Sequence, residues 1–239
     1  MIGDTHSNIA AFTAACDYAV RHGIEGLISV GDFNVLPRVE ESIEFIIEVH
    51  RLLEAHGLWL LLIEGNHDDH TTLEYLPRDD RGMGILGPRA RHASRGLRFT
   101  IRRREFLAVG GAVSVDQAHR TLGVDWFDDE ALSFADVNRC IDGGPADVII
   151  AHDCPEGVPD IVPATNWSKG DVYSAANRRA VLAIVEATRP VILFHGHHHV
   201  RYTNQLVLSD GTSVQVEGLG HDHSGDDLYT VLDLYELFG

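Results

Sequence analysis

Residues Leu58–Asp68 read LWLLLIEGNHD, a run of large apolar residues that ends at Ile63 and is followed, after Glu64 and Gly65, by three polar side chains. The run is too short to cross a membrane, and its length and composition predict a buried strand. Asn66, His67 and Asp68 therefore stand where that strand ends. Open α/β sheets carry their chemistry at the carboxyl ends of strands, so these residues are candidates for metal or proton chemistry.

Length and charge limit the classes of protein that fit. The chain has 239 residues, near the upper end of single-domain size, and we expect one domain over residues 1–239. The formal net charge of −17 argues against nonspecific binding to nucleic acid or to a membrane surface, because such binding needs a positive protein surface. It suits a soluble protein, or carboxylates that bound cations neutralise.

The cysteines and the amino-terminal residues bear on the compartment. Cys16, Cys140 and Cys154 have no CxxC spacing and imply no disulfide framework, which is typical of a reducing cytoplasm. The start, MIGDTHSN, shows neither the basic segment nor the apolar core of a signal peptide. No apolar stretch is long enough to span a bilayer. We therefore expect a cytoplasmic protein without a membrane partner.

Helices and strands are predicted to alternate along the chain. Apolar spacing predicts a helix over residues 9–20, a strand over 27–30, a helix between Pro37 and Gly57, and then the strand described above. This is the βαβ pattern of a layered α/β domain. The later predicted strands cover 97–101, 106–109, 148–151, 191–194, 202–208, 213–219 and 229–234, and the later predicted helices 133–140 and 173–188.

The same event recurs at five points of the sequence: a short apolar segment stops, and Asp, His or Asn follows. The five blocks are Asp4-x-His6, Gly31-Asp32, Gly65-Asn66-His67-Asp68, His152 and Gly196-His197-x-His199. Because the carboxyl ends of parallel strands meet at one edge, we expect these side chains to converge. Nitrogen and oxygen donors without thiolates suit Mn, Fe or Zn, and two such metals are the usual device for hydrolysing phosphate esters.

In this order and spacing the blocks resemble the signature of the calcineurin-like metallophosphoesterase superfamily: DxH, GD, GNH(D/E), a lone His and GHxH. Any one block is a weak signal, but all five in order span most of the chain and are a strong one. The resemblance implies an α/β fold, a two-sheet α/β/β/α sandwich with mixed sheets and the metals at the strand ends. It also implies hydrolysis of a phosphoester by a hydroxide that bridges two divalent metal ions.

The resemblance further implies a role for each residue of the blocks. The metal ligands would be Asp4, His6 and His199 for the first metal, Asn66, His152 and His197 for the second, and Asp32 as the bridge between them. His67 would face the scissile phosphate and either protonate the leaving alkoxide or stabilise charge on the phosphoryl group. Asp68 would orient His67 and tune its charge.

Two departures from the family pattern bear on the site and on the substrate. Only three residues precede Asp4, so the first strand either begins upstream or is stunted, and a stunted strand would loosen the first metal site. Phe33, Asn34 and Val35 follow Asp32, where protein Ser/Thr phosphatases of the superfamily have an Asp-Arg pair that binds a phosphomonoester. The block GNHD, rather than GNHE, looks more like the bacterial and phage-type phosphodiesterases.

We therefore expect a small phosphodiester, such as a cyclic nucleotide, as the substrate, and manganese as the metal, with iron and zinc as alternatives. A phosphomonoesterase acting on proteins or small molecules remains an alternative, as does a nuclease, which would need a basic channel. A noncatalytic metal-binding scaffold is a more remote alternative. The sequence leaves the oligomeric state open.

Other histidines, aromatics and cations have weaker patterns. His221 and His223 are expected in a polar loop that could edge the cleft, His70 and His92 in solvent, and His198 behind the ligands or facing substrate. Arg120 is either a phosphate contact or the ion-pair partner of Asp116. Trp126, Phe127 and Trp167 either pack or line a base-stacking pocket. The one basic concentration is expected to be a solvated hairpin with Arg103-Arg104 at its turn, or else a phosphate-guiding face: Arg89, Arg91, Arg95, Arg98 and Arg102–Arg104.

Overall fold

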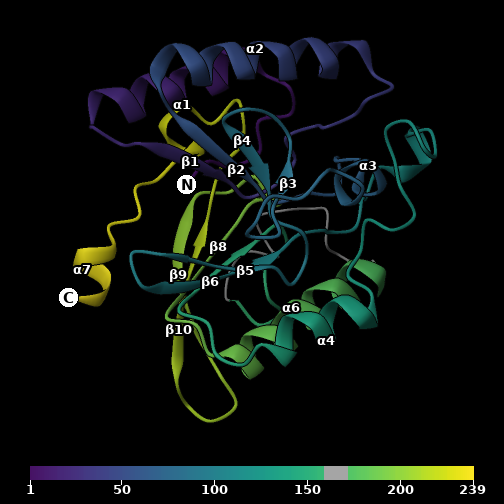
Figure 1. The fold of residues 1–239 in the computed structure, drawn as a ribbon. Coiled ribbons are helices and arrows are strands. Elements are labelled where there is room, and N and C mark those ends of the chain that lie inside the picture. The colour runs from purple at the N-terminus through teal and green to yellow at the C-terminus, as the bar shows by residue number, and fades with distance from the viewer. Residues whose placement is uncertain (159–171) are drawn as a thin grey trace.

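The computed structural model describes residues 1–158 and 172–239, which form four layers (Figure 1). The first half of the chain contains α1 (Ile9–Arg21), β1 (Gly26–Ser29), α2 (Glu40–His56), β2 (Trp59–Leu62), α3 (His70–Glu74), β3 (Gly84–Ile85) and β4 (Ala90–His92). The second half contains β5 (Arg98–Ile101), β6 (Arg104–Val109), η1 (Gln117–His119), α4 (Phe134–Asp142), β7 (Val148–Ala151), α6 (Val172–Thr188), β8 (Ile192–His195), β9 (Tyr202–Val207), β10 (Ser213–Gly218), η2 (Gly225–Leu228) and α7 (Leu234–Phe238).

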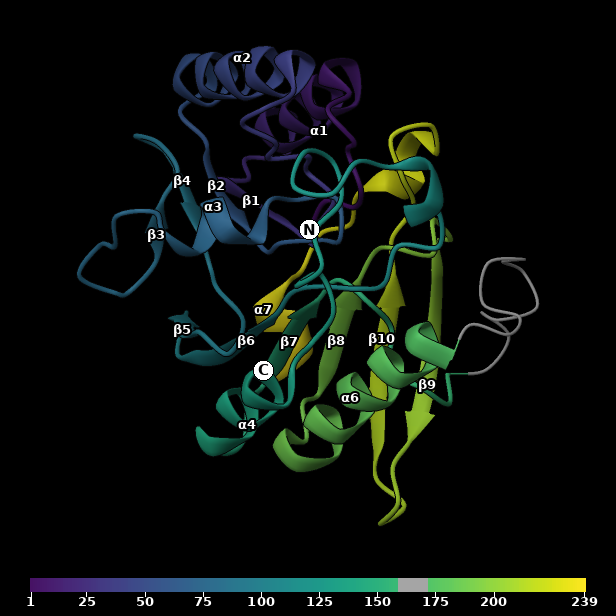
Figure 2. The same cartoon turned by 90° about the vertical axis from the view of Figure 1, so that its right-hand side faces the viewer.

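Two mixed sheets form the middle layers. The first has the order β1-β2-β4-β3 and is parallel except for β3. The second has the order β5-β6-β7-β8-β10-β9, with antiparallel strands at both edges. Helices α1 and α2 cover the first sheet, and α4 and α6 cover the second (Figure 2). The predicted α/β/β/α sandwich with mixed sheets is confirmed. None of the described helices is long and apolar enough to cross a membrane.

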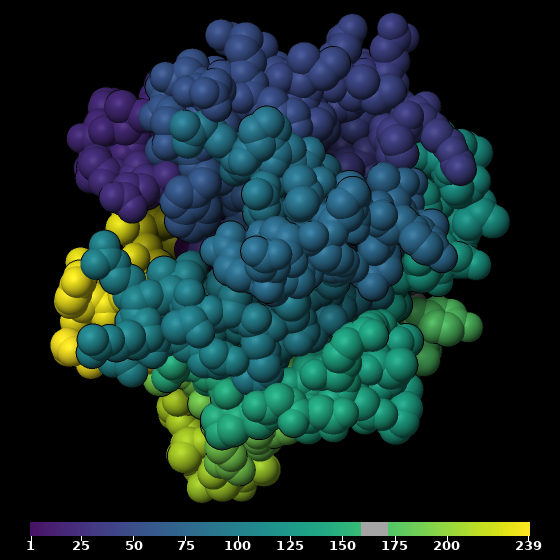
Figure 3. Space-filling model, viewed as in Figure 1, coloured from purple at the N-terminus to yellow at the C-terminus, as the bar shows by residue number. Residues whose placement is uncertain are grey.

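The apolar run of β2 is continuous because both of its faces are buried. Leu60 and Leu62 face α1 and α2, whereas Leu61 and Ile63 face the second sheet. Successive side chains of a strand point to opposite faces, so one run supplies two apolar layers. In the space-filling view, residues coloured from blue to teal cover this face between α2 at the top and α4 at the bottom (Figure 3).

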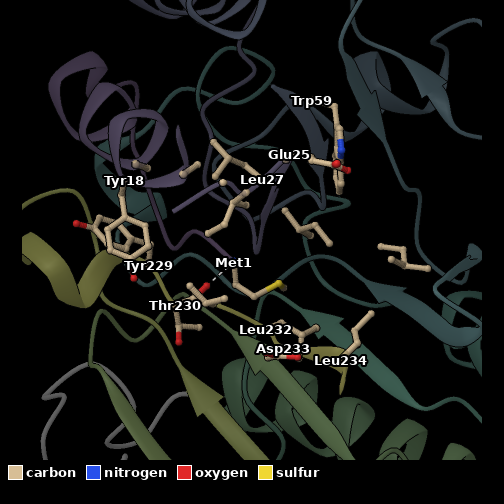
Figure 4. A pocket seen from close by; sticks show the side chains of 18 of the residues that line it. Met1, Tyr18, Glu25, Leu27, Trp59, Tyr229, Thr230, Leu232, Asp233 and Leu234 are labelled. Carbon is tan, nitrogen blue, oxygen red and sulfur yellow. Dashed lines mark hydrogen bonds between the residues drawn. The ribbon is translucent and has the colours of Figure 1, made fainter. Parts of the chain in front are cut away.

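The residues before Asp4 are held on both sides despite their small number. Ile2 pairs with β1 through hydrogen bonds from its N–H to the Ile28 carbonyl (2.8 Å) and from the Val30 N–H to its own carbonyl (3.0 Å). On the other side, the Met1 amino group donates to the Thr230 carbonyl at 2.7 Å (Figure 4). A pocket of about 380 Å³ beside these contacts lies at the amino ends of β1 and β2, away from the predicted metal ligands.

The third predicted strand of the tail, over residues 229–234, is wrong. Tyr229 makes a single bridge to Ile2, and a helix, α7, begins at Leu234. The Asp233 carboxylate accepts hydrogen bonds from the N–H groups of Tyr235 and Glu236 and so caps this helix. Of the predicted strand only Leu234 lies in that helix, and residues 230–233 are in neither a strand nor a helix.

The expectation that His70 and His92 are solvated is also wrong, since their exposed fractions are 7 % and 1 %. His92 Nε2 lies 2.6 Å from a Glu64 carboxylate oxygen, and Arg95 Nη2 lies 2.7 Å from His70 Nδ1. Arg95 Nε lies 3.2 Å from the second Glu64 oxygen. Burying these groups singly would be costly, and the cluster supplies their partners.

The basic hairpin formed by β5 and β6 is only partly solvated. Its turn lies at Arg102 and Arg103, one residue earlier than predicted, and both have positive φ (50° and 69°), as a two-residue hairpin turn requires. Arg98 donates to the carbonyls of Pro145 and Cys140, at 2.8 and 3.1 Å, and so ties the hairpin to the end of α4.

Candidate metal centre

The strand ends bring their polar side chains together in two groups that share one carboxylate. Each group offers one donor atom per residue, and these atoms lie within 4.8 Å of one another: the first is Asp4, His6, Asp32 and His199, and the second is Asp32, His152 and His197. These residues follow Ile2 and strands β1, β7 and β8, whose carboxyl ends meet at one edge of the sandwich. Asp32 thus lies where the resemblance implies a bridge.

The donor spacings are those of ligands around common metal ions. Asp32 Oδ1 lies 3.2 Å from His152 Nε2, and Asp32 Oδ2 lies 4.0 Å from His6 Nε2. His199 Nε2 lies 3.1 Å from His6 Nε2 and 3.2 Å from Asp4 Oδ2. Two ligands of a tetrahedral zinc, each about 2.0–2.1 Å from the metal, lie roughly 3.3 Å apart. Three of these four separations, at 3.1–3.2 Å, match that spacing, and the one between Asp32 and His6 is longer.

The backbone at four of these residues is held in a conformation that side chains seldom adopt. His6, Asp32, His197 and His199 have φ values of 44°, 47°, 62° and 57°. Such a conformation costs about 1–3 kcal/mol per residue and concentrates at functional sites. These turns direct the four side chains inward from the strand ends, toward one another.

Two glycines of the sequence blocks allow loops that carry candidate ligands to pack closely against each other. A Cβ at Gly65 would overlap Asp32 Oδ1, and a Cβ at Gly196 would overlap Asp4 Oδ1. These glycines are therefore required by the close approach of neighbouring carboxylates, rather than by turn geometry alone.

One carboxylate oxygen in the first group lacks a partner. Asp4 is fully buried, and its Oδ1 has no hydrogen bond among the described residues. Burying an unpaired carboxylate oxygen is costly unless a cation lies beside it. The residues present therefore fit divalent cations: the oxygen that lacks a partner is a donor, and the donor set is nitrogen and oxygen.

The electrostatics of the site favour ionised carboxylates. Burial opposes ionisation of Asp4 and Asp32, but the surrounding histidines lower the pKa of Asp4 and hold the pKa of Asp32 well below its usual range. Burial likewise opposes the charged form of His152, but Asp32 and Asp4 raise its pKa to about 10. Burial lowers the pKa of His197 to about 3, so this imidazole is already neutral, as metal binding requires.

Metal binding is expected to stabilise the fold and to depend on pH. Manganese at about 100 times its Kd should raise the free energy of unfolding by about 2.7 kcal/mol.

Because His152 holds a proton below about pH 10, a metal that binds it must displace that proton. The apparent metal affinity should therefore rise about tenfold per pH unit from about pH 6 to about pH 8. Calorimetric titration of the metal at several pH values measures this slope. Removal of the exposed η1 imidazole by H119Q should leave it unchanged, and a pH-independent affinity would exclude His152 as a ligand.

Asn66 is oriented by a buried chain that the sequence did not reveal. Its Nδ2 donates to Ser114 Oγ at 2.9 Å, and the Ser114 hydroxyl donates to Glu130 at 2.5 Å. The amide oxygen of Asn66 is left to face His152 Nε2, 3.0 Å away. Glu130 follows no strand and belongs to no motif, so no sequence signal pointed to it.

Asp153 was also missed, although it follows His152 at the same strand end. Its carboxylate accepts from Asn177 Nδ2 at 2.8 Å and lies 3.1 Å from His198 Nε2. His198 is 4 % exposed. Of the two positions left open for His198, its burial fits the one behind the candidate ligands, and it is not among the residues that line the cavity.

The side chains of His67 and Asp68 make different contacts although the two residues are adjacent in the sequence. His67 Nε2 lies 3.9 Å from Asp32 Oδ2, at the cavity. The fully buried Asp68 carboxylate accepts instead from the backbone N–H groups of Gly65 and Val35, at 2.7 and 2.8 Å. No hydrogen bond of the described residues joins Asp68 to His67, so in the structure Asp68 holds the Asp32 loop against the loop that carries His67. Burial, with the nearby Asp32 charge, raises the pKa of Asp68 to about 6.

Replacing Asp68 with asparagine should therefore weaken the fold and the metal site together. An amide has one acceptor oxygen, and its NH₂ would face a backbone N–H. We expect a loss of about 1–3 kcal/mol in the free energy of unfolding and of about 10–100-fold in metal affinity. Urea unfolding and metal titration measure both, with D17N on the exposed face of α1 as the control. Unchanged values for D68N would contradict the loop-holding role.

A cavity of about 240 Å³ opens over the donors. Its lining residues are Asp32, Asn66, His67, Val115, Asp116, His197 and His199. Arg120 stands beside it and, of the two predicted alternatives, forms the ion pair with Asp116. Its Nη2 lies 2.7 Å from Asp116 Oδ2 and 3.2 Å from His67 Nε2.

The loop that carries His221 borders the metal site. The His221 ring stacks on that of His199, with centroids 4.5 Å apart. Asp222 accepts from Asn8 Nδ2 at 2.9 Å and thereby ties this loop to the start of α1. Of the three aromatics considered, Phe127 is buried, Trp126 is not among the cavity-lining residues, and Trp167 lies outside the described residues.

A two-sheet sandwich whose strand ends carry two donor groups around a shared carboxylate defines a dinuclear metallohydrolase. The family model described as calcineurin-like phosphoesterase matches residues 1–201, and the chain belongs to that family. It is a metal-dependent phosphoesterase, as the sequence blocks predicted.

Solved structures support the fold. The protein TT1561 of Thermus thermophilus is 15 % identical with a TM-score of 0.60, over 99 % of this chain and 93 % of that chain. A dimetal phosphatase from Danio rerio is 14 % identical with a TM-score of 0.52, over 90 % of this chain and 78 % of that chain. No curated protein sequence matches the chain.

Proposed function

We propose that the protein hydrolyses a small phosphodiester, such as a cyclic nucleotide. The observation that carries this proposal is the cavity lining, which among the described residues contains metal donors, His67 and Asp116 but no lysine or arginine. A phosphodiester carries one negative charge and a phosphomonoester up to two, so a cavity without a lining cation favours the diester. Phe33, which follows Asp32, is fully buried against Phe12 and offers nothing to the cavity.

Two divalent metals, with manganese as the first choice and iron or zinc as alternatives, would bind the two donor groups. The proposed ligands are Asp4, His6 and His199 on one side, Asn66, His152 and His197 on the other, and Asp32 between them. When bound, such metals acidify water and neutralise phosphoryl oxygens. The family and the Danio rerio neighbour, a dimetal phosphatase by its title, support a site of two metals.

The chain's own contribution to the reaction would come from His67. Its Nε2 faces the cavity next to Asp32, where it can donate a proton or a hydrogen bond to the departing alkoxide. Asp68 would act on His67 indirectly, by holding the two loops in register.

We also propose that residues 1–239 form one domain, because the two sheets share one apolar interior. We further propose that the protein is cytoplasmic, since its three free cysteines suit a reducing compartment.

A substrate panel tests the proposal. The manganese-loaded protein should cleave bis-p-nitrophenyl phosphate or a cyclic nucleotide more efficiently than p-nitrophenyl phosphate, measured as kcat/KM. Efficient cleavage of p-nitrophenyl phosphate with no action on the diesters would overturn the diester assignment. Salt-sensitive binding and cleavage of DNA would instead favour a nuclease.

A further inference from the structure

The loop after β6 places an ion pair at the mouth of the metal cavity. Asp116 begins the short helix η1 and Arg120 follows its end, so their side chains meet across one turn. Arg120 Nε and Nη2 lie 2.8 and 2.7 Å from the same Asp116 oxygen, Oδ2. Asp116 lines the cavity, together with Val115 and the metal donors.

Arg120 has few donors left for a phosphate. Besides its two contacts with Asp116, its Nη2 lies 3.2 Å from His67 Nε2 and its Nη1 lies 3.4 Å from the Asp125 carbonyl. The Arg120 guanidinium beside His67 is thus paired with a carboxylate, and that carboxylate, of Asp116, lines the cavity. A second negative charge on the substrate would meet Asp116 rather than a free guanidinium.

We propose that the Asp116–Arg120 ion pair determines which substrate charge the site prefers. It would disfavour phosphomonoesters with two negative charges and accept phosphodiesters with one. The inference rests on the proposed function of the site and names two residues that determine its specificity. The organic substituent of the diester would contact Val115, an apolar side chain that is 45 % exposed beside Asp116. Placing like charges together is a common way of rejecting the wrong partner.

The alternative is that the Asp116–Arg120 pair only stabilises the conformation of the loop. A second carboxylate of the same loop has such a role: Asp125 Oδ1 accepts from the Thr121 N–H at 2.6 Å, and Asp125 does not line the cavity. D125N therefore removes the same charge from the same loop without changing the cavity wall, and it serves as the matched control for D116N.

The test compares D116N, R120Q and D125N in the manganese-loaded protein. The first readout is the ratio of kcat/KM for p-nitrophenyl phosphate to that for bis-p-nitrophenyl phosphate. The second is calorimetric binding of inorganic phosphate at about pH 8, where it is mostly a dianion, against dimethyl phosphate, a monoanion. D116N should raise the ratio about tenfold and tighten phosphate binding, R120Q should shift both in the opposite direction, and D125N should leave both near the wild-type value.

The outcomes separate this inference from the proposed function. An unchanged ratio in D116N and R120Q, or an equal shift in D125N, would overturn the specificity role while leaving the phosphodiesterase activity in place. A wild-type protein that prefers monoesters would overturn the charge argument itself. A wild-type protein that cleaves neither substrate would overturn the proposed function, and this inference with it.

Discussion

Replacing Asp32 with asparagine is expected to empty both metal positions and to abolish most of the activity. Asp32 is the one residue that belongs to both donor groups, and its two oxygens face different histidines, His152 at 3.2 Å and His6 at 4.0 Å. An asparagine offers one oxygen and no charge. We expect metal affinity to fall by more than about 100-fold and kcat/KM by about 10³-fold or more.

Asparagine rather than alanine is the informative substitution at this position. Asp32 Oδ1 also accepts the backbone N–H of His67 at 2.9 Å, and an amide oxygen can keep that bond. Metal content and steady-state kinetics measure the effect. D147N, at the opposite end of β7, should retain both metals. If D32N also bound two metals and turned over substrate normally, Asp32 would not be the bridge.

Replacing His67 with alanine should lower kcat by about 10²–10⁴-fold while both metals stay bound. His67 belongs to neither donor group, yet its ring borders the same cavity. If His67 protonates the departing oxygen, the loss should be larger for a poor leaving group, such as the ribose alkoxide of a cyclic nucleotide, than for p-nitrophenolate.

This leaving-group comparison also distinguishes the two roles considered for His67. H67Q can donate a hydrogen bond but cannot transfer a proton at neutral pH. Recovery of activity in H67Q would favour charge stabilisation of the phosphoryl group, whereas equal losses in H67A and H67Q with a steep leaving-group dependence would favour proton transfer. Full activity in H67A, with two metals bound, would remove His67 from the mechanism.

Most of the candidate metal centre could be anticipated because its signal is local. Each block of candidate ligands stands at the end of a short apolar segment, and each glycine of the blocks stands beside a candidate ligand in the sequence. The strand order was then enough to bring Asp32, His152 and His197 together at one edge. The helix capped by Ser133 was predictable for the same reason, since its capping box lies within four residues.

The roles of side chains that depend on distant partners could not be anticipated. Asp68 stands next to His67 in the sequence, but it accepts from two N–H groups of the loop after β1, those of Phe33 and Val35, and from the Gly65 N–H of its own loop. His70 and His92 looked like surface residues, but in the structure the buried Glu64 pairs with His92 and the half-buried Arg95 contacts His70. In each case the deciding contact joins residues from different strands and loops.

Apolar periodicity, turn residues and ligand spacing were therefore sufficient for the fold class, the donor set and the family, because each is a pattern within a short segment. Only the folded chain decided which buried groups orient Asn66, which contacts Asp68 makes, and that the Asp116–Arg120 ion pair, one of two alternatives for Arg120, lies at the cavity beside His67. The physical reason is that burial makes every polar group find a partner, and the partner is chosen by packing between segments far apart in the chain.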